Sequence, residues 1–137
     1  MANFDEAYKR TLKFEGGWCK EDGDTGGETY KGISRVFHKS WAGWKIVDSY
    51  KNKPNWPKNM ESDATLQALV KDCYNENYWK PIWGDKLTNQ KVANDLYDTA
   101  VNMGVGTSIK LAQRQFKLAV TCKMNEALLK KLNSVAK

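Results

Sequence analysis

Residues 14–34, FEGGWCKEDGDTGGETYKGIS, contain six of the chain's ten glycines and five of its sixteen acidic residues. Glycine adopts positive φ angles easily and weakens a helix interior, so this stretch predicts a break in any helical fold. The sequence therefore predicts a loop with a small β-hairpin near residues 24–33. Because the chain has a net charge of +6, the clustering of carboxylates in one flexible segment makes that segment a candidate functional site.

The rest of the chain is patterned for helices, because apolar residues recur at steps of three and four. Ser62 is the expected cap of the third helix, and Pro81 is expected to end it. The prediction is a mostly α fold with a small β-hairpin after the first helix. The expected helices cover residues 3–15, 34–44, 62–80, 89–103, a segment from 107 or 108 through 119, and 128–135, with a surface connection over 45–61.

Length and composition indicate one soluble domain over residues 1–137. A chain of 137 residues with 41% hydrophobic residues can bury a core without disulfide or metal staples. No apolar run approaches the roughly 18 residues of a membrane span, and the start, MANFDEAYKR, lacks the apolar region of a secretory signal. We therefore expect no membrane insertion and no Sec-type export signal.

The cysteines and the single histidine form no metal-binding or nucleophile pattern. Cys19, Cys73 and Cys122 show no CxxC or Cys/His spacing, so we expect free and mostly buried thiols. A calcium loop is the alternative for Asp22, Asp24 and Glu28, because their acids alternate as ligands of a hard cation do. Gly26 stands where an EF-hand needs a third ligand, so we expect no metal and no cofactor.

The basic balance, with a pI of about 9.2, suits an anionic partner. Nucleic acid, acidic lipid and the carboxylate-bearing bacterial wall all qualify. The lysines and arginines are spread along the chain and form no recognised nucleic-acid motif, so we do not expect a nucleic-acid partner. Six tryptophans are many for this length, and exposed aromatic rings are what sugars and bases stack on.

Glu15 and Asp24 are candidates for the two catalytic carboxylates of a glycosidase. Glu15 continues the apolar stripe of the first predicted helix in its last turn, where burial and the helix dipole both favour a protonated carboxyl. Asp24 follows across a glycine-rich loop that can fold back toward it. Glycosidic cleavage needs an acid and usually a second carboxylate, and unlike surroundings assign their roles. Thr29 can place a hydroxyl beside an attacking water. An ordinary helix end and an ordinary turn residue are the alternative interpretation.

Four segments together carry a resemblance to a known family. FEGGW, DTGGETYKGIS, YWKPIWGDKL and LYDTAVNMGVGTSIKLAQR, in this order over about residues 4–116, resemble the signatures of glycoside hydrolase family 108 muramidases. The resemblance implies Glu15 as the catalytic acid and places the family's Asp and Thr on Asp24 and Thr29. It also implies a lysozyme-like helical fold.

Further substrate contacts follow from the same resemblance. Tyr30, Trp79 and Trp83 are expected to stack on sugar faces, with core packing as the alternative for each ring. Asp98 and Asn102 are expected to bond to hydroxyl or N-acetyl groups, although Asn102 could instead cap its helix. The chain departs from the family in two places: Thr25 replaces a proline, and helices expected over about 107–137 stand in place of the family's peptidoglycan-binding segment with its Asp-Gly-x-x-Gly turn.

The expected function is hydrolysis of the β-1,4 bond between N-acetylmuramic acid and N-acetylglucosamine in peptidoglycan, by general acid catalysis. A wall-binding module without catalysis and a lytic transglycosylase are the alternatives. We expect a monomer whose partner is the glycan strand. We also expect synthesis in a bacterial cytoplasm and action on the wall after release or export, through a holin or a secretion apparatus.

Overall fold

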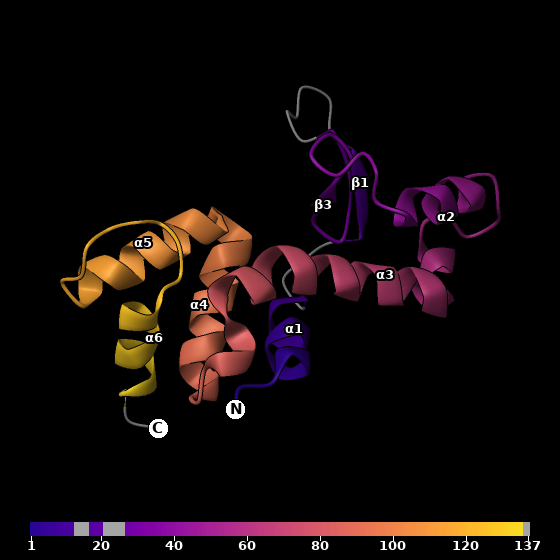
Figure 1. Cartoon of the computed structure of the whole chain (residues 1–137). Helices are drawn as coiled ribbons and strands as arrows, with labels where there is room; N and C mark the ends of the chain where they lie inside the picture. Colours follow the sequence, from indigo (N-terminus) through magenta and orange to yellow (C-terminus); the bar gives the residue numbers. More distant parts are fainter. Residues whose placement is uncertain (13–16, 21–26, 136–137) are drawn as a thin grey trace. The chain divides into compact units, whose positions relative to one another are not determined.

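A computed structural model describes residues 1–12, 17–20 and 27–135, as drawn in Figure 1. These residues form two compact units, Leu12–Cys73 and the combination of Met1–Thr11 with Tyr74–Lys137. Across the described part of the chain there are six α-helices and one small antiparallel sheet, which follows the first helix. The mostly α fold class is thereby confirmed. The single-domain organisation stays a prediction, and each unit is described by itself.

The unit Leu12–Cys73 is built on the sheet. Its strands, in spatial order, are β1 (Trp18–Lys20), β2 (Glu28–Tyr30) and β3 (Ile33–Ser34). Lys31 and Gly32, between β2 and β3, have φ angles of 47° and 84°. Positive φ at both central residues is typical of the tight turns that match the twist of a hairpin. Three helices complete the unit: α2 (Gly43–Tyr50), the 3-10 helix η1 (Lys58–Ser62) and α3 (Ala64–Tyr74).

Gln67 on α3 holds the core of this unit together. Its amide nitrogen donates to the hydroxyl of Tyr30 at 2.9 Å and to the carbonyl of Met60 at 3.1 Å. Strand, 3-10 helix and α-helix are therefore joined at one side chain. The buried residues around it come from all of these elements: Tyr30, Ile33, Trp44, Val47, Met60, Leu66 and Val70.

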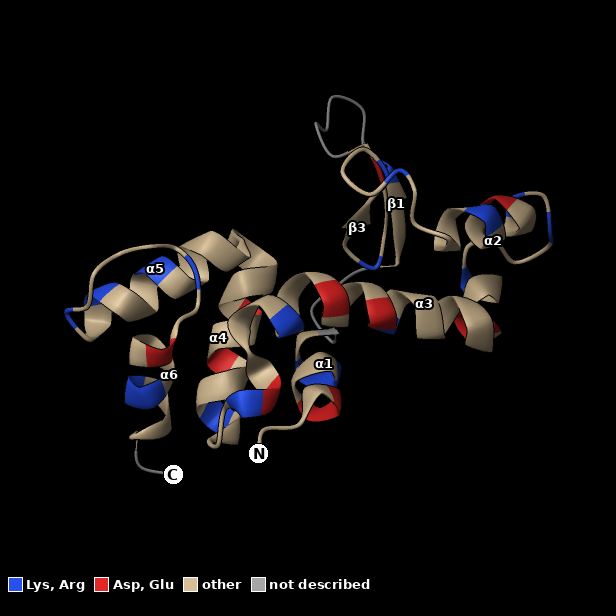
Figure 2. Ribbon diagram, viewed as in Figure 1, with Lys and Arg blue, Asp and Glu red and all other residues tan. Residues whose placement is uncertain are grey.

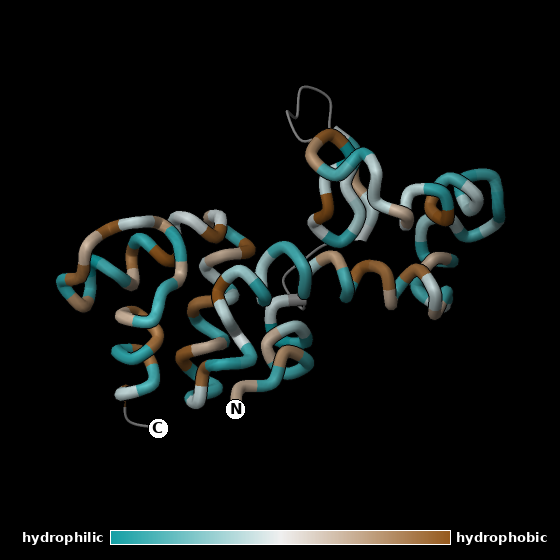
Figure 3. Tube along the Cα trace, in the orientation of Figure 1, coloured by the Kyte–Doolittle hydropathy of each residue, from teal (hydrophilic) through white to brown (hydrophobic). Residues whose placement is uncertain are grey.

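The other unit is helical. It contains α1 (Phe4–Leu12), the π-helix η2 (Asn75–Trp79), the 3-10 helices η3 (Lys80–Ile82) and η4 (Gly84–Lys86), α4 (Gln90–Met103), α5 (Val105–Gln115) and α6 (Glu126–Asn133). Trp79 lies in its core, with ring centroids 5.5 Å from Phe4 and 5.8 Å from Tyr97. The indole nitrogen of Trp79 donates to Asp85 at 2.8 Å, so its one polar atom is satisfied. Brown, hydrophobic positions recur along α4 and α5 in Figure 3, as expected of helices with one buried face.

Helix ends confirm part of the sequence prediction. The helix expected over 89–103 is α4, and Asn89 caps it by accepting from the backbone N–H groups of Lys91 and Val92. The last short helix is α6, capped by Asn125. α1 reaches Leu12, and the remaining residues of its predicted span, 13–15, lie outside the described residues.

Three predictions about helices are wrong. Residues 34–42 form the end of β3 and turns. α2 begins at Gly43 and lies mostly within 45–61, the segment expected to be a connection. Ser62 belongs to η1, and Asp63 is the cap, because its carboxylate accepts from Leu66 N at 2.9 Å. The helix expected over 62–80 ends as an α-helix at Tyr74 and continues through a π turn and a 3-10 turn around Pro81.

Surface properties agree with the basic composition. Figure 2 shows lysine and arginine on helices of both units, without concentration on one element. Among the helices of the described residues, none has the length and apolarity needed to span a bilayer. Cys73 is buried, whereas Cys19 and Cys122 are exposed, so the expectation of mostly buried thiols is wrong for Cys19 and Cys122.

Candidate active site

The predicted catalytic carboxylates belong to segments that adjoin the sheet. In the sequence, Glu15 stands three residues before the start of β1, and Asp24 belongs to the link between β1 and β2. Both residues lie outside the described residues. The site is therefore built from what flanks them: Trp18 at the start of β1, Lys20 at its end, and the residues of β2.

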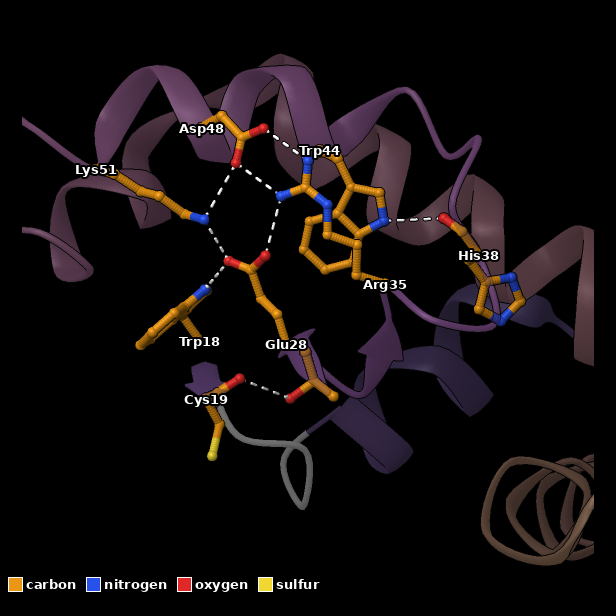
Figure 4. Close-up of polar contacts among 9 residues, drawn as sticks. Trp18, Cys19, Glu28, Arg35, His38, Trp44, Asp48 and Lys51 are labelled. Atoms are coloured by element: carbon orange, nitrogen blue, oxygen red, sulfur yellow. Dashed lines mark hydrogen bonds and ion pairs between the residues drawn. The ribbon is translucent and has the colours of Figure 1, made fainter. Parts of the chain in front are cut away.

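Thr29 occupies the middle of β2, opposite Cys19 on β1 and Ser34 on β3. Its hydroxyl is half-buried and donates to the carbonyl of Cys19 at 3.4 Å. Successive strand residues point to opposite faces, so Thr29 and Cys19 share one face of the sheet, and Glu28 and Tyr30 point to the other. Figure 4 shows this division, with Cys19 and Glu28 on opposite sides of the strands.

Glu28 is the centre of a charged network on its face of the sheet (Figure 4). Its side chain is 9% exposed and accepts from Lys51 Nζ at 2.6 Å and from Arg35 at 2.9 Å. Trp18 Nε1 donates to the same carboxylate at 2.6 Å. Both terminal nitrogens of Arg35 also donate hydrogen bonds to the carboxylate of Asp48, at 2.7 and 2.8 Å. The network thus fastens β1 and β2 to α2.

The network keeps its acids ionised. Burial raises the pKa of Glu28, but hydrogen bonds from Lys51, Trp18 and Arg35 together outweigh it and leave the pKa below its ordinary value. Arg35 lowers the pKa of Asp48 to about 2, with a smaller contribution from Lys51. The bonds to Asp48 and Glu28 raise the pKa of Arg35 in turn. Glu28 is therefore an ionised structural carboxylate at neutral pH and is a poor candidate for a proton donor.

Sequence reasoning missed this role of Glu28 and weighed it only as a calcium ligand. Two cations already occupy its oxygens, and among the described residues no group of three or more His, Cys, Asp or Glu side chains is placed to hold a metal. One signal was available: in the alternation of β2, Glu28 shares the buried face with Tyr30. A carboxylate on such a face calls for cationic partners.

Two of the expected sugar-stacking rings lie in the core. Tyr30 is 1% exposed and bonded to Gln67, and Trp79 is 0% exposed among Phe4, Tyr97 and Gly84. Stacking requires an open ring face, and neither ring offers one here. Trp83 is different, because it is half-buried, adopts a left-handed backbone with φ 55°, and has Lys86 Nζ 4.5 Å from its ring centroid.

Asp98 and Asn102 lie one turn apart on α4 and have protein partners. Thr11, buried in the last turns of α1, donates to Asp98 Oδ1 at 3.1 Å. The exposed Asn102 amide donates to the backbone carbonyl of Asp98 at 2.9 Å. One carboxylate oxygen of Asp98 thus fixes α1, while Asn102 bonds within its own helix.

The structure therefore brings the predicted residues together in two groups. Thr29 and Tyr30 share β2, while Asp98 and Asn102 share α4 in the other unit. Trp79 and Trp83 also belong to the helical unit, one inside it and one at its surface.

The sequence matches the profile described as Glycosyl hydrolase 108 over residues 8–104. A similar fold occurs in a solved structure titled "Structure of Brucella abortus SagA". That protein is 24% identical to this chain, with a TM-score of 0.68, over 97% of this chain and 70% of the other. No curated protein matches the chain.

Proposed function

The chain belongs to glycosyl hydrolase family 108, and from this we propose that it hydrolyses the glycan strands of peptidoglycan. The bond cleaved is the β-1,4 linkage between N-acetylmuramic acid and N-acetylglucosamine, which makes the protein an N-acetylmuramidase. The observation that carries the proposal is the family match over residues 8–104, because this range includes Glu15, Asp24 and Thr29.

Each of the three residues has a distinct role in the proposed reaction. Glu15 protonates the glycosidic oxygen of the leaving sugar. Asp24, ionised, directs water or stabilises the positive charge that develops on the sugar ring. Thr29 is half-buried and orients that water through its hydroxyl, whose one hydrogen bond among the described residues is a long one of 3.4 Å to Cys19 O. A hydroxyl so weakly engaged can turn to a water molecule at little cost.

The sugar contacts in this proposal come from the residues that keep an accessible polar or aromatic group. Trp83 offers part of its ring, Asp98 has one carboxylate oxygen beyond its bond to Thr11, and Asn102 is exposed. Tyr30 and Trp79 support the two units from inside.

The proposed setting is the bacterial cell wall. The protein is made in the cytoplasm, acts as a monomer, needs no cofactor, and reaches the wall through a holin, a secretion apparatus or lysis of the cell. The net charge of +6 supports attraction to the carboxylates of the wall polymer.

Mass spectrometry of the soluble products from purified peptidoglycan tests the proposal. Hydrolysis by a muramidase leaves N-acetylmuramic acid at the reducing end of each fragment. An anhydro end on N-acetylmuramic acid would identify a lytic transglycosylase instead. Binding without any released fragments would identify a wall-binding module and contradict the enzymatic proposal.

A further inference from the structure

A pocket of about 370 Å³ lies beside the Glu28 network in the unit Leu12–Cys73. It is lined by Lys20, Glu28, Arg35, Val36 and Lys39, and is called here the Lys20–Lys39 pocket. Three of its five lining residues are cationic. The question is whether those charges are available to a ligand.

Two of the lining charges are already used within the protein. Glu28 and Arg35 pair with each other at 2.9 Å, and both belong to the network with Asp48 and Lys51. That network contains two acids and two bases, so its formal charge is zero. The carboxylate of Glu28 therefore does not make the pocket negative.

Lys20 and Lys39 supply the remaining charge. Both are exposed, and neither forms an ion pair with any acid of residues 1–12, 17–20 or 27–135. Added to a network whose formal charge is zero, these two lysines give the described residues at the pocket a formal charge of +2. Such a site attracts a carboxylate or another small anion.

The pocket lies on the face of the sheet opposite Thr29. Lys20 stands directly opposite Glu28 in the sheet, so both side chains lie on the face away from Thr29. The apolar wall of the pocket is Val36, which is 46% exposed, and the next residue, Phe37, is 73% exposed. Exposed apolar groups next to lysines that pair with no acid of the described residues suit a ligand that carries both sugar or alkyl surface and a carboxylate.

We propose that the Lys20–Lys39 pocket binds a carboxylate of the wall polymer, as an attachment point on the face of the sheet opposite Thr29. This inference rests on the proposed function for the identity of the polymer. The carboxylate can come from the peptide attached to the glycan or, where that peptide has been removed, from the lactyl group of N-acetylmuramic acid. The pocket holds the strand and takes no part in bond cleavage.

Cosedimentation with purified peptidoglycan at low ionic strength tests the inference. The chain with Glu15→Gln, used to keep the polymer intact, is compared with the same chain carrying Lys20→Gln and Lys39→Gln. The matched control carries Lys91→Gln and Lys123→Gln, which remove the same charge from exposed positions of the other unit. We expect the pocket variant to lose about fivefold in affinity, the value for two exposed charge contacts, and the control to lose less than about twofold.

The source of the carboxylate follows from a second polymer. In peptidoglycan stripped of its peptides by an amidase, the carboxylates are those of the lactyl groups, which the amidase has freed. If the fivefold loss disappears on this polymer, the peptide supplies the carboxylate. If it persists, the lactyl group does. Equal losses in the pocket and control variants, or no loss in either, would overturn the inference.

Two further readouts keep the outcomes distinct. Vesicles of equimolar phosphatidylglycerol and phosphatidylcholine test an anionic membrane as the ligand. Binding to them that depends on Lys20 and Lys39, without any such dependence on peptidoglycan, would overturn the inference in favour of a lipid surface. If the chain cleaves the wall but its affinity for the wall does not depend on Lys20 and Lys39, the pocket alone is refuted. If binding depends on these lysines but no cleavage occurs, the proposed enzymatic activity alone is refuted.

Discussion

The indole N–H of Trp18 donates a hydrogen bond of 2.6 Å to the carboxylate of Glu28. Trp18 ends the FEGGW segment that carries Glu15, and Glu28 directly precedes Thr29. This bond therefore connects β1, which follows the proposed acid Glu15, to β2, which carries Thr29, the residue proposed to orient the water. Lys51 and Arg35 secure the same carboxylate to α2. The charged network thus supports the candidate active site without supplying its chemistry.

Replacing Glu28 by glutamine tests this supporting role. Glutamine keeps the size of the side chain but leaves Lys51 and Arg35 without one of their two acids. We expect the free energy of unfolding to fall by about 1 to 3 kcal/mol, measured by urea denaturation. Glu76→Gln is the control, since Glu76 pairs with Lys80 on an exposed surface, and should cost less than about 0.5 kcal/mol. Equal effects of both substitutions would contradict the role assigned to Glu28.

The same network predicts a loss of stability in acid. The pKa values of Glu28 and Asp48 are lowered in the folded protein, that of Asp48 to about 2. The folded state therefore binds protons more weakly than the unfolded state, and the stabilisation is complete above about pH 5 and declines as the pH falls toward 2. Thermal melts across this range should show the decline. Glu28→Gln should flatten it, and an unchanged slope in that variant would contradict the assignment.

Thr11 and Asp98 should be energetically coupled. The buried hydroxyl of Thr11 donates to Asp98, so Thr11→Val removes the donor while keeping the shape of the side chain. We expect the free energy of unfolding to fall by about 1 kcal/mol. A double-mutant cycle with Asp98→Ala should give a coupling energy of about the same size. Additive losses in the cycle would show that the bond does not fix α1 to α4. Thr99→Val serves as a control, because Thr99 bonds only to a carbonyl within α4.

Gly84 should be intolerant of a side chain. A Cβ atom at this position would lie 2.1 Å from the ring of Trp79, which fills the core of the helical unit. Gly84→Ala is therefore expected to cost about 1 to 3 kcal/mol in urea denaturation. Gly106 on α5 is the matched control, since its nearest atom, Cys122 Cβ, would be 3.7 Å away. Gly106→Ala should be neutral or stabilise the protein by up to about 1 kcal/mol.

The fold could be predicted where local signals and burial agree. α4 follows from the spacing of its apolar residues and from a capping asparagine at residue 89, and both signals lie within the helix itself. Residues 34–44 have similar apolar spacing, but residues 34–42 contain no helix. Ile33 and Trp44 are buried there, whereas Val36 and Phe37 face solvent, so the apparent stripe does not correspond to one buried face. Periodicity alone cannot show which apolar residues reach the core.

The supporting network could not be predicted, because its partners are far apart in sequence. Glu28 meets Arg35 seven residues later, Trp18 ten residues earlier, and Lys51 at the C-terminal end of α2. The burial of Trp79 could not be predicted from the sequence either. A tryptophan two residues before a proline and four before a second tryptophan fits either a buried core position or a surface on which sugars stack. Its packing against Phe4 decided for the core.

The central claim is that Glu15 is the proton donor in cleavage of the wall polymer. Its most direct test is the lytic rate of Glu15→Gln on purified peptidoglycan, with the unaltered chain and Glu28→Gln measured beside it. General acid catalysis contributes about 10²- to 10⁴-fold, so the rate of Glu15→Gln should fall by at least about 100-fold while binding to the polymer persists. Glu28→Gln, assayed where it is folded, should retain most of its activity. A Glu15→Gln protein that lyses peptidoglycan at the unaltered rate would contradict the account.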